Sequence, residues 1–310
     1  MDQHSDHSRN RERRKREERK DEAVHGGSSR ASALAAEATE GGETAILMQG
    51  GTMSYSRVRG GEGVCVGGGP DSSRRGAGAR EVGVRQQAEE TVGLLVDQRE
   101  EELEEEVVVL EKVHLRVQRG QFVVICGQIG AGKSTLLAAL AEALPLARGR
   151  VTSNGSRAYA GQKAFVMTGS IRDNVLFQQR MDTRRYWDAL QRAQLMPDLA
   201  LLPQGDLTVV GTEGVQLSGG QRARVALARV LYADVDVVLL DDIMSALDAH
   251  TGAAVWRDAL CWSKSRGKTV VLVTHQLQLL QRAEVDLVAL LAGQRLVACA
   301  PFAEVQHIHT

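Results

Sequence analysis

The chain is poor in aromatic residues, carries almost no net charge and lacks any long apolar run. Aromatic side chains make up 4% of its 310 residues, and the formal net charge is −1. This balance gives no support to nucleic-acid binding, which favours a basic domain. No apolar stretch approaches the roughly eighteen residues that cross a bilayer, and the polar start is unlike a secretory signal. We therefore expect a cytoplasmic chain with no transmembrane segment and no nucleic-acid partner.

Cysteines are few and scattered, at positions Cys65, Cys126, Cys261 and Cys299, and no two form a C-x-x-C pair. They indicate neither a zinc site nor a disulfide framework, so a reducing compartment is the simplest setting. What the chain does have is a 43% apolar content, which is enough to fill a sizeable core.

Two segments are too polar or too glycine-rich to bury much apolar surface. Residues 1–42 comprise a mixed-charge block followed by a Gly/Ser/Ala-rich tail. We predict a disordered charged arm there; the alternative is a basic arm that binds anionic lipid. Residues 56 to about 106 begin glycine-rich and end in the acidic run Glu100–Glu106. We predict that this low-complexity insertion loops out of a folded domain spanning 43–310.

The first motif that carries chemistry is Gly127-Gln-Ile-Gly-Ala-Gly-Lys-Ser134. It matches the phosphate-loop pattern G-x-x-x-x-G-K-[ST], and it lies between an apolar run (122–126) and a helix-like segment (135–144), as that motif requires. A glycine-rich turn lets backbone N–H groups face phosphate oxygens at a helix N-terminus. The predicted nucleotide-binding residues are Gly127, Gln128, Ile129, Gly130, Ala131, Gly132, Lys133, Ser134 and Thr135.

A second motif, Leu217-Ser-Gly-Gly-Gln221, resembles the signature of ATP-binding-cassette (ABC) ATPases. Other segments fit that family in the expected order: Gln162 as the Q-loop glutamine, Val237–Asp241 as the Walker B strand, Ser245–Asp248 as the D-loop, and Val271–His275 as the strand ending at the switch histidine. The chain is thereby identified as a member of the ABC ATPases.

Within that family the chain is most similar to subfamily C, the multidrug-resistance-associated exporters, and there to the first of the two nucleotide-binding domains. The segments that carry this likeness include Arg157–Gln162, Gly169–Phe177, Gly205–Gly211 and Thr274–Gln278. The resemblance runs from about Val107 to Val305.

The resemblance implies an α/β fold of the P-loop NTPase type, with a RecA-like core, an antiparallel β-subdomain and an α-helical subdomain that carries the signature. It implies ATP and Mg²⁺ as cofactors, the metal being held by Ser134, Gln162 and Asp241. Gln162, Asp242 and His275 are the implied catalytic residues. In this family Ser218, Gly219, Gly220 and Gln221 contact the ATP of an opposite subunit, so a complete site requires a dimer.

Asp242 departs from most active cassettes, which have glutamate at this position as the general base. Aspartate is one methylene shorter, and a misplacement of about an ångström can reduce a rate by about 10²-fold. First domains of subfamily C carry the same aspartate and turn ATP over poorly. We therefore expect a slow, degenerate catalytic half-site.

The aromatic residue on which adenine stacks in this family lies near the end of the first β-strand. No aromatic residue lies between Tyr55 and Phe122. We infer that Tyr55 is the stacking residue, separated from its sheet by the insertion; the alternative is that Tyr55 is a linker residue and the contact is lost.

Two local patterns add expectations about structure. Asn154-Gly155 is a hairpin signal. The segment 186–195 is helical in pattern, and Trp187 and Leu190 are spaced for one buried face.

The leading functional hypothesis is an ATPase cassette that binds and slowly hydrolyses ATP to drive export. Its expected partners are a second nucleotide-binding domain, in a homo- or heterodimer, and the transmembrane domains of an ABC exporter. A subfamily C exporter carries its membrane domains on the same chain, whereas this sequence has no apolar stretch long enough to cross a bilayer. We therefore expect this chain to lie peripherally at the cytosolic face of a membrane. The alternatives are a fragment of a full exporter, an ATP-locked regulatory cassette without enzymatic activity, and a non-transport ABC ATPase.

Overall fold

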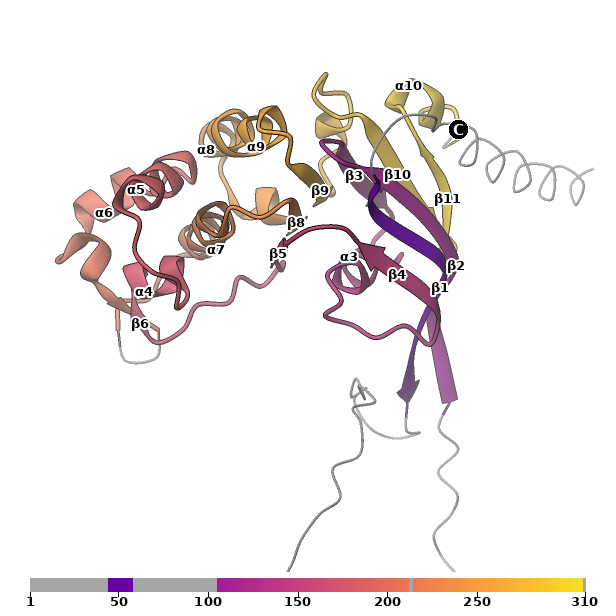
Figure 1. Cartoon of the computed structure of the whole chain (residues 1–310), viewed down its shortest axis with the longest axis horizontal. Helices are drawn as coiled ribbons and strands as arrows, with labels where there is room; N and C mark the ends of the chain where they lie inside the picture. Colours follow the sequence, from indigo (N-terminus) through magenta and orange to yellow (C-terminus); the bar gives the residue numbers. More distant parts are fainter. Residues whose placement is uncertain (1–43, 58–104, 212–213, 309–310) are drawn as a thin grey trace, which may run out of the picture.

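The computed structural model of the chain describes residues 44–57, 105–211 and 214–308, with backbone alone for 55–57 and 105–106. The predicted arm at 1–42 and most of the predicted insertion lie outside these ranges. Figure 1 shows the described part as an elongated molecule, with strands gathered at one end and helices at the other.

The larger sheet has six strands in the order β11-β10-β3-β9-β8-β5. All neighbouring strands are parallel except β10 and β11, which are antiparallel. The strands are β3 (Phe122–Gly127), β5 (Arg157–Ala160), β8 (Val237–Asp241), β9 (Thr269–Val273), β10 (Leu287–Ala292) and β11 (Arg295–Ala300). Every residue of β8 and β9 is buried, as expected for strands covered on both faces of a parallel sheet.

Helices and a second sheet cover the two faces of this sheet. Alternate residues of a strand point to opposite faces, so Phe122 lies in a core that includes α7 (Gly219–Ala233). Val123 lies in a second core that includes α3 (Lys133–Leu140) and the antiparallel strands. The mixed α/β fold with a mainly parallel sheet, predicted from the sequence, is confirmed.

The smaller sheet is antiparallel, with the strand order β2-β1-β4. It comprises β1 (Thr44–Arg57), β2 (Glu105–Gln118) and β4 (Arg148–Ser153). Its apolar face, which includes Met53 and Leu110, packs with α3 in the second core. This sheet is the antiparallel subdomain that the resemblance implied.

The other end of the molecule is mainly helical, and α7 contacts both α4 and α5 there (Figure 1). Its elements are β6 (Gly169–Ser170), α4 (Ile171–Leu176), α5 (Thr183–Arg192), α6 (Met196–Leu201), η1 (Gly205–Leu207) and β7 (Val209–Val210). The remaining elements are η2 (Ile243–Ala246), α8 (Ala249–Val255), the π-helical η3 (Trp256–Cys261), α9 (Trp262–Ser265), η4 (Leu277–Leu279) and α10 (Phe302–Val305).

The hairpin predicted at Asn154-Gly155 is wrong. This turn joins β4 to β5, but β4 belongs to the antiparallel sheet and β5 to the six-stranded sheet. Gly155 has φ of 107°, and a Cβ there would lie 2.7 Å from Asp236 Oδ2. The turn chemistry was therefore recognised correctly, whereas the partners of the two strands were decided by tertiary packing.

The prediction that Trp187 is buried is also wrong. Tyr186 and Leu190 are fully buried on α5, whereas Trp187 is 39% exposed. Residues at i and i+4 share a helix face, so Tyr186 takes the core position beside Leu190 and turns Trp187 outward. Trp187 contacts the Tyr186 ring edge-on, with 5.3 Å between the ring centroids.

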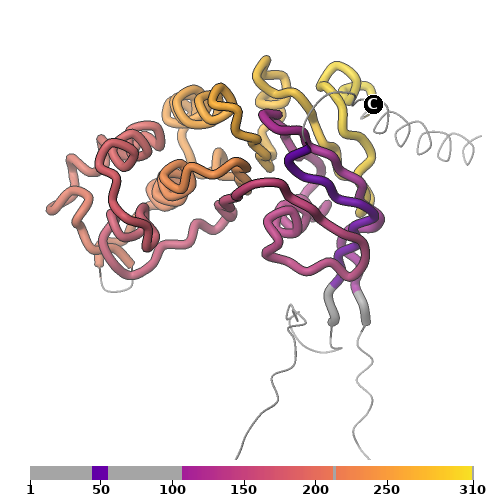
Figure 2. The backbone as a smooth tube through the Cα atoms, viewed as in Figure 1, coloured from indigo at the N-terminus to yellow at the C-terminus, as the bar shows by residue number. Residues whose placement is uncertain are grey.

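The ends of β1 and β2 lie next to each other, although 47 positions of the sequence separate them. Arg57 pairs with Glu105, and Tyr55 pairs with Val107. Figure 2 shows the two strands side by side along the antiparallel sheet. A chain of a few residues could therefore connect the two strands.

We predict that a variant in which a short Gly/Ser linker replaces residues 60–104 has a thermal midpoint within about 4 °C of the wild type. A change of about 1 kcal/mol in the free energy of unfolding shifts the midpoint of a domain of this size by about that amount. The reason is that the composition of this segment buries little apolar surface. Thermal unfolding in the presence of ATP tests this, and Val113→Asp, in the buried face of β2, checks that the assay detects core damage. Insoluble protein would show that the segment contributes to the core.

Candidate nucleotide-binding site

Three neighbouring strands bring the candidate residues to one edge of the six-stranded sheet. Ile125 of β3 and Asp241 of β8 both pair with Val273 of β9. The phosphate loop follows β3, Asp241 ends β8, and His275 follows β9. Because the strands are parallel, their carboxyl ends meet at the same edge, where ligands bind in open α/β sheets.

The phosphate loop needs glycine at the positions where the backbone is most constrained. Gly127, Gly130 and Gly132 have φ values of 147°, 81° and 87°. A Cβ on Gly127 would lie 2.3 Å from the Leu291 carbonyl oxygen, and one on Gly132 would lie 2.8 Å from a Leu110 side-chain carbon. Close neighbours and positive φ therefore explain glycine at positions 127 and 132, and the positive φ alone explains it at position 130.

Lys133 is 5% exposed, and its ammonium group lies on the loop itself. Its Nζ donates to the carbonyl oxygens of Gly127 (3.0 Å) and Gln128 (2.8 Å). Burial lowers the pKa of Lys133, and the nearby Asp242 carboxylate opposes that shift. The amino end of α3 has no side-chain cap and no acidic residue in its first turn. Uncapped N–H groups beside a lysine fit a phosphate group well.

Ser134 and Asp241 form a hydrogen-bonded pair of side-chain oxygens beside this loop. Ser134 Oγ donates to Asp241 Oδ1 at 3.0 Å, and Asp241 is 2% exposed. Burial raises the pKa of Asp241, and the adjacent Asp242 charge raises it further. A bound cation would relieve both effects. Among the described residues no three His, Cys, Asp or Glu side chains cluster as a metal cage; Mg²⁺ at phosphate sites takes many of its ligands from water and phosphates.

Asp242 lies one residue beyond this pair in an unusual backbone conformation. Its φ is 49°, and it is 5% exposed. Its backbone N–H donates to the Val273 carbonyl oxygen (3.0 Å), and its carbonyl oxygen accepts from Ser245 Oγ (2.7 Å). Within the described part of the chain, Asp242 Oδ1 is buried without a hydrogen-bond partner. Such an atom costs about 1–3 kcal/mol, and a water molecule at the site would satisfy it.

Gln162 and His275 reach the same edge from two further segments. Both side chains are exposed, and the Gln162 backbone forms a hydrogen bond with Asp241 that lowers the pKa of that carboxyl group. His275 follows Thr274, whose backbone N–H donates to the Ile125 carbonyl oxygen at 3.2 Å. Both residues therefore lie at the carboxyl edge of the sheet, two residues beyond the ends of β5 and β9, and are open to solvent.

Tyr159 belongs to this cluster, although it was not among the site residues predicted from the sequence. Its hydroxyl lies 3.5 Å from Asp241 Oδ2, and burial together with the Asp241 charge raises the pKa of Tyr159 to about 12. The signal that could have identified it is its place near the carboxyl end of β5, the strand next to β8.

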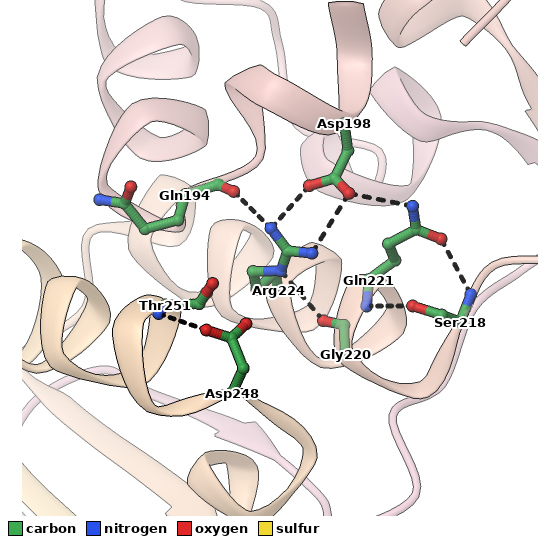
Figure 3. A network of polar contacts seen from close by, with 8 residues as sticks. All are labelled: Gln194, Asp198, Ser218, Gly220, Gln221, Arg224, Asp248 and Thr251. Carbon is green, nitrogen blue, oxygen red and sulfur yellow. Dashed lines mark hydrogen bonds and ion pairs between the residues drawn. The ribbon is translucent and has the colours of Figure 1, made fainter. Parts of the chain in front are cut away.

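Ser218, Gly219, Gly220 and Gln221 lie at the start of α7 rather than around α3. Ser218 Oγ accepts from the Gln221 backbone N–H (3.2 Å), and Gln221 Oε1 accepts from the Ser218 backbone N–H (2.9 Å), which forms a capping box (Figure 3). Ser218 and Gly219 are exposed, and a Cβ on Gly219 would meet nothing within 4 Å. Ser218 and Gly219 therefore face outward.

For Tyr55 the structure describes the backbone alone. Tyr55 is part of β1 and pairs with Val107 at the start of β2, so it belongs to a strand of the antiparallel sheet. Its stacking on adenine stays a prediction.

The glycine-rich loop lies between the buried strand β3 and α3, and its lysine is buried. Ser134, at the start of α3, donates to Asp241 at the end of β8, which is two strands away from β3 in the sheet. Together these features define a P-loop NTPase. Residues 110–245 match the family model described as "ABC transporter". Residues 110–245 thus form an ATP-binding domain similar to that of ABC transporters.

Curated relatives place this domain close to subfamily C. "ABC transporter C family member 13" of Oryza sativa subsp. indica is 45% identical over 179 residues, which is 58% of this chain and 12% of the relative. "ABC transporter C family member 5" of Arabidopsis thaliana is 41% identical over 179 residues, with the same shares. "ATP-binding cassette sub-family C member 2" of Homo sapiens is 39% identical over 173 residues, 56% of this chain and 11% of the relative.

The matched segment thus corresponds to about an eighth of the length of these relatives. None of the helices in the described ranges is both long and apolar enough to span a bilayer.

We predict that Lys133→Ala weakens ATP binding by about 100-fold or more, because hydrogen bonds to charged groups contribute about 1.5–3 kcal/mol each. Equilibrium titration with a fluorescent ATP analogue measures the effect. Lys112→Ala is the matched control, since that lysine side chain is 74% exposed on β2. Equal affinities of the Lys133 variant and the wild type would contradict the assignment of the loop.

Proposed function

We propose that the chain is the ATP-binding cassette of a subfamily C exporter, of the type found as the first nucleotide-binding domain, and that it binds Mg²⁺–ATP and hydrolyses it slowly. The observation that carries the proposal is the hydrogen bond from Ser134 Oγ to the buried Asp241 carboxylate (3.0 Å), beside the lysine of the phosphate loop. Phosphoryl transfer depends on such positioning and charge neutralisation more than on covalent chemistry.

Each residue of the cluster has a role that its position supports. Lys133 would leave the loop carbonyl oxygens for the β- and γ-phosphates, where it finds stronger acceptors. Ser134 and Asp241 would hold Mg²⁺, which neutralises phosphate charge during transfer. Gln162 would contact the metal and the attacking water, and His275 would contact the γ-phosphate; both are exposed at the carboxyl edge of the sheet.

Asp242 would orient the attacking water as the general base, from a position that limits its reach. Hydrogen bonds to Val273 and from Ser245 hold its backbone, so the backbone cannot easily shift to compensate for a short side chain. A carboxylate displaced by about an ångström lowers the rate by about 10²-fold. The same feature favours a second candidate, a regulatory cassette that holds ATP without turnover.

The outward-facing signature implies a dimer. In this proposal Ser218, Gly219, Gly220 and Gln221 contact the ATP held by another cassette, in a homo- or heterodimer, because a helix N-terminus suits an anion. The further partners are the transmembrane domains of an exporter, which would place the cassette at the cytosolic face of a membrane. The transported molecule would contact those membrane domains.

We predict that Asp242→Glu raises ATP turnover by about tenfold or more. The longer side chain moves the carboxylate toward the water, whereas Asp242→Asn, which keeps the length and removes the base, should lower turnover further. Steady-state phosphate release measures both, and thermal midpoints identify any loss from crowding at this buried position. Rapid turnover by the wild type, unaffected by the Glu change, would contradict a short-reach base.

We predict that Ser218→Arg abolishes ATP-dependent self-association, because a long cation would occupy the place of the second cassette's phosphate. Analytical ultracentrifugation of the Asp242→Asn background, with and without Mg²⁺–ATP, provides the measurement. Ser265→Arg makes the same change on the exposed end of α9 and should leave association intact. Association that survives Ser218→Arg would exclude the signature from the interface.

A further inference from the structure

The capping box of the signature helix is tied to a neighbouring helix through Asp198. Asp198 lies on α6, and its Oδ1 accepts from Gln221 Nε2 at 2.9 Å. Gln221 is the residue whose Oε1 accepts from the Ser218 backbone N–H. Figure 3 shows the resulting chain of contacts from Asp198 through Gln221 to Ser218.

Arg224, one turn further along α7, holds the same carboxylate. Arg224 lies 2.6 Å from Asp198 Oδ2 through one terminal nitrogen and 3.2 Å from Oδ1 through the other. Both side chains are only 15% exposed. Arg224 also donates to the carbonyl oxygen of Gln194 at 2.6 Å and to that of Gly220 at 3.3 Å. One hydrogen bond and one ion-pair contact therefore hold the carboxylate in a largely buried position.

The hydrogen bond between Asp198 and Gln221 determines which atoms of the signature are accessible from outside. With Gln221 held by Asp198, its Oε1 faces the Ser218 backbone N–H, and its own backbone N–H donates to Ser218 Oγ. The Ser218 hydroxyl oxygen therefore accepts a hydrogen bond within the capping box. The hydroxyl proton stays available for donation to an acceptor outside the helix. Without an acceptor at Nε2, the amide group can rotate and lose its contact with Ser218.

We propose that Asp198 is a positioning residue for the signature: by holding the Gln221 amide it orients Ser218 toward the phosphate of a second cassette. This inference rests on the proposed function, in which the signature completes another cassette's site. Asp198 itself does not reach the surface that Ser218 presents, so it acts through Gln221.

A second Asp–Arg pair supplies a matched control. Asp188 and Arg192 form an ion pair at 2.8 Å within α5, with 40% and 26% of the side chains exposed. Within the described part of the chain this pair makes no hydrogen bond to Ser218 or Gln221, and it shares the chemistry of the Asp198–Arg224 pair. Asp188→Asn therefore reports the general effect of removing such a carboxylate from the helical end of the molecule.

The first test is hydrogen exchange of the backbone amides of residues 218–224. Gln221→Glu preserves the capping-box chemistry but places a second carboxylate against Asp198, so exchange should accelerate by about tenfold. The double variant Asp198→Asn/Gln221→Glu again has a single carboxylate, now at position 221, which faces an amide at position 198. In this variant the exchange rate should return to within about threefold of the wild-type rate. Asp198→Ala should accelerate exchange, and Asp188→Asn should not. Unchanged exchange in Asp198→Ala, or no restoration in the double variant, would overturn the proposal.

The second test separates positioning from general destabilisation. In the Asp242→Asn background, Asp198→Ala should weaken ATP-dependent self-association by about tenfold while the affinity of the monomer for ATP stays unchanged. The double variant at 198 and 221 should recover association. Association by Asp198→Ala equal to that of the Asp188→Asn control would overturn the positioning role. Absence of association in the parent protein would instead contradict the proposed dimer, and the exchange experiment would still decide the role of Asp198.

Discussion

The parallel alignment of β3, β9 and β8 is the constraint on which the site depends. Val273 pairs with Ile125 on one side and with Asp241 on the other, so the three strands end at the same level. This alignment places the Ser134 hydroxyl 3.0 Å from a carboxylate 107 positions away in the sequence. The two cores on either face of the sheet hold this arrangement, because each strand contributes alternate residues to each core.

Charged side chains at this edge are buried. Lys133, Asp241 and Asp242 are each at most 5% exposed, and burial shifts the pKa of Lys133 down and that of Asp241 up. Both shifts mean that the charged forms lack the solvation that water would give them. Shifts of this kind concentrate at functional sites. A nucleotide and a cation would supply the charges that the protein interior does not.

The candidate site at the sheet edge contacts the start of α7, which we propose as the surface that meets another cassette. A Cβ on Gly220 would lie 2.8 Å from the Ala246 carbonyl oxygen, so the start of α7 packs directly on η2. That segment begins next to Asp242, whose carbonyl oxygen accepts from Ser245. The signature helix is thus held from two sides, by the loop after Asp242 and by Asp198 on α6. A shift of either support would change the direction in which Ser218 faces.

The sequence by itself determined the ATPase family, the mixed α/β fold and the residues of the phosphate loop, because each depends on local patterns: glycines at fixed spacing, an apolar run and a lysine at a helix start. It could not determine contacts between distant segments. The turn at Asn154-Gly155 was recognised, but the sheets that its two strands join were not. Trp187 was assigned to the core, yet Tyr186 occupies that position. Tyr159 beside Asp241 and Asp198 beside Gln221 were found only in the structure, because their partners are brought to them by tertiary packing, which no spacing along the chain encodes.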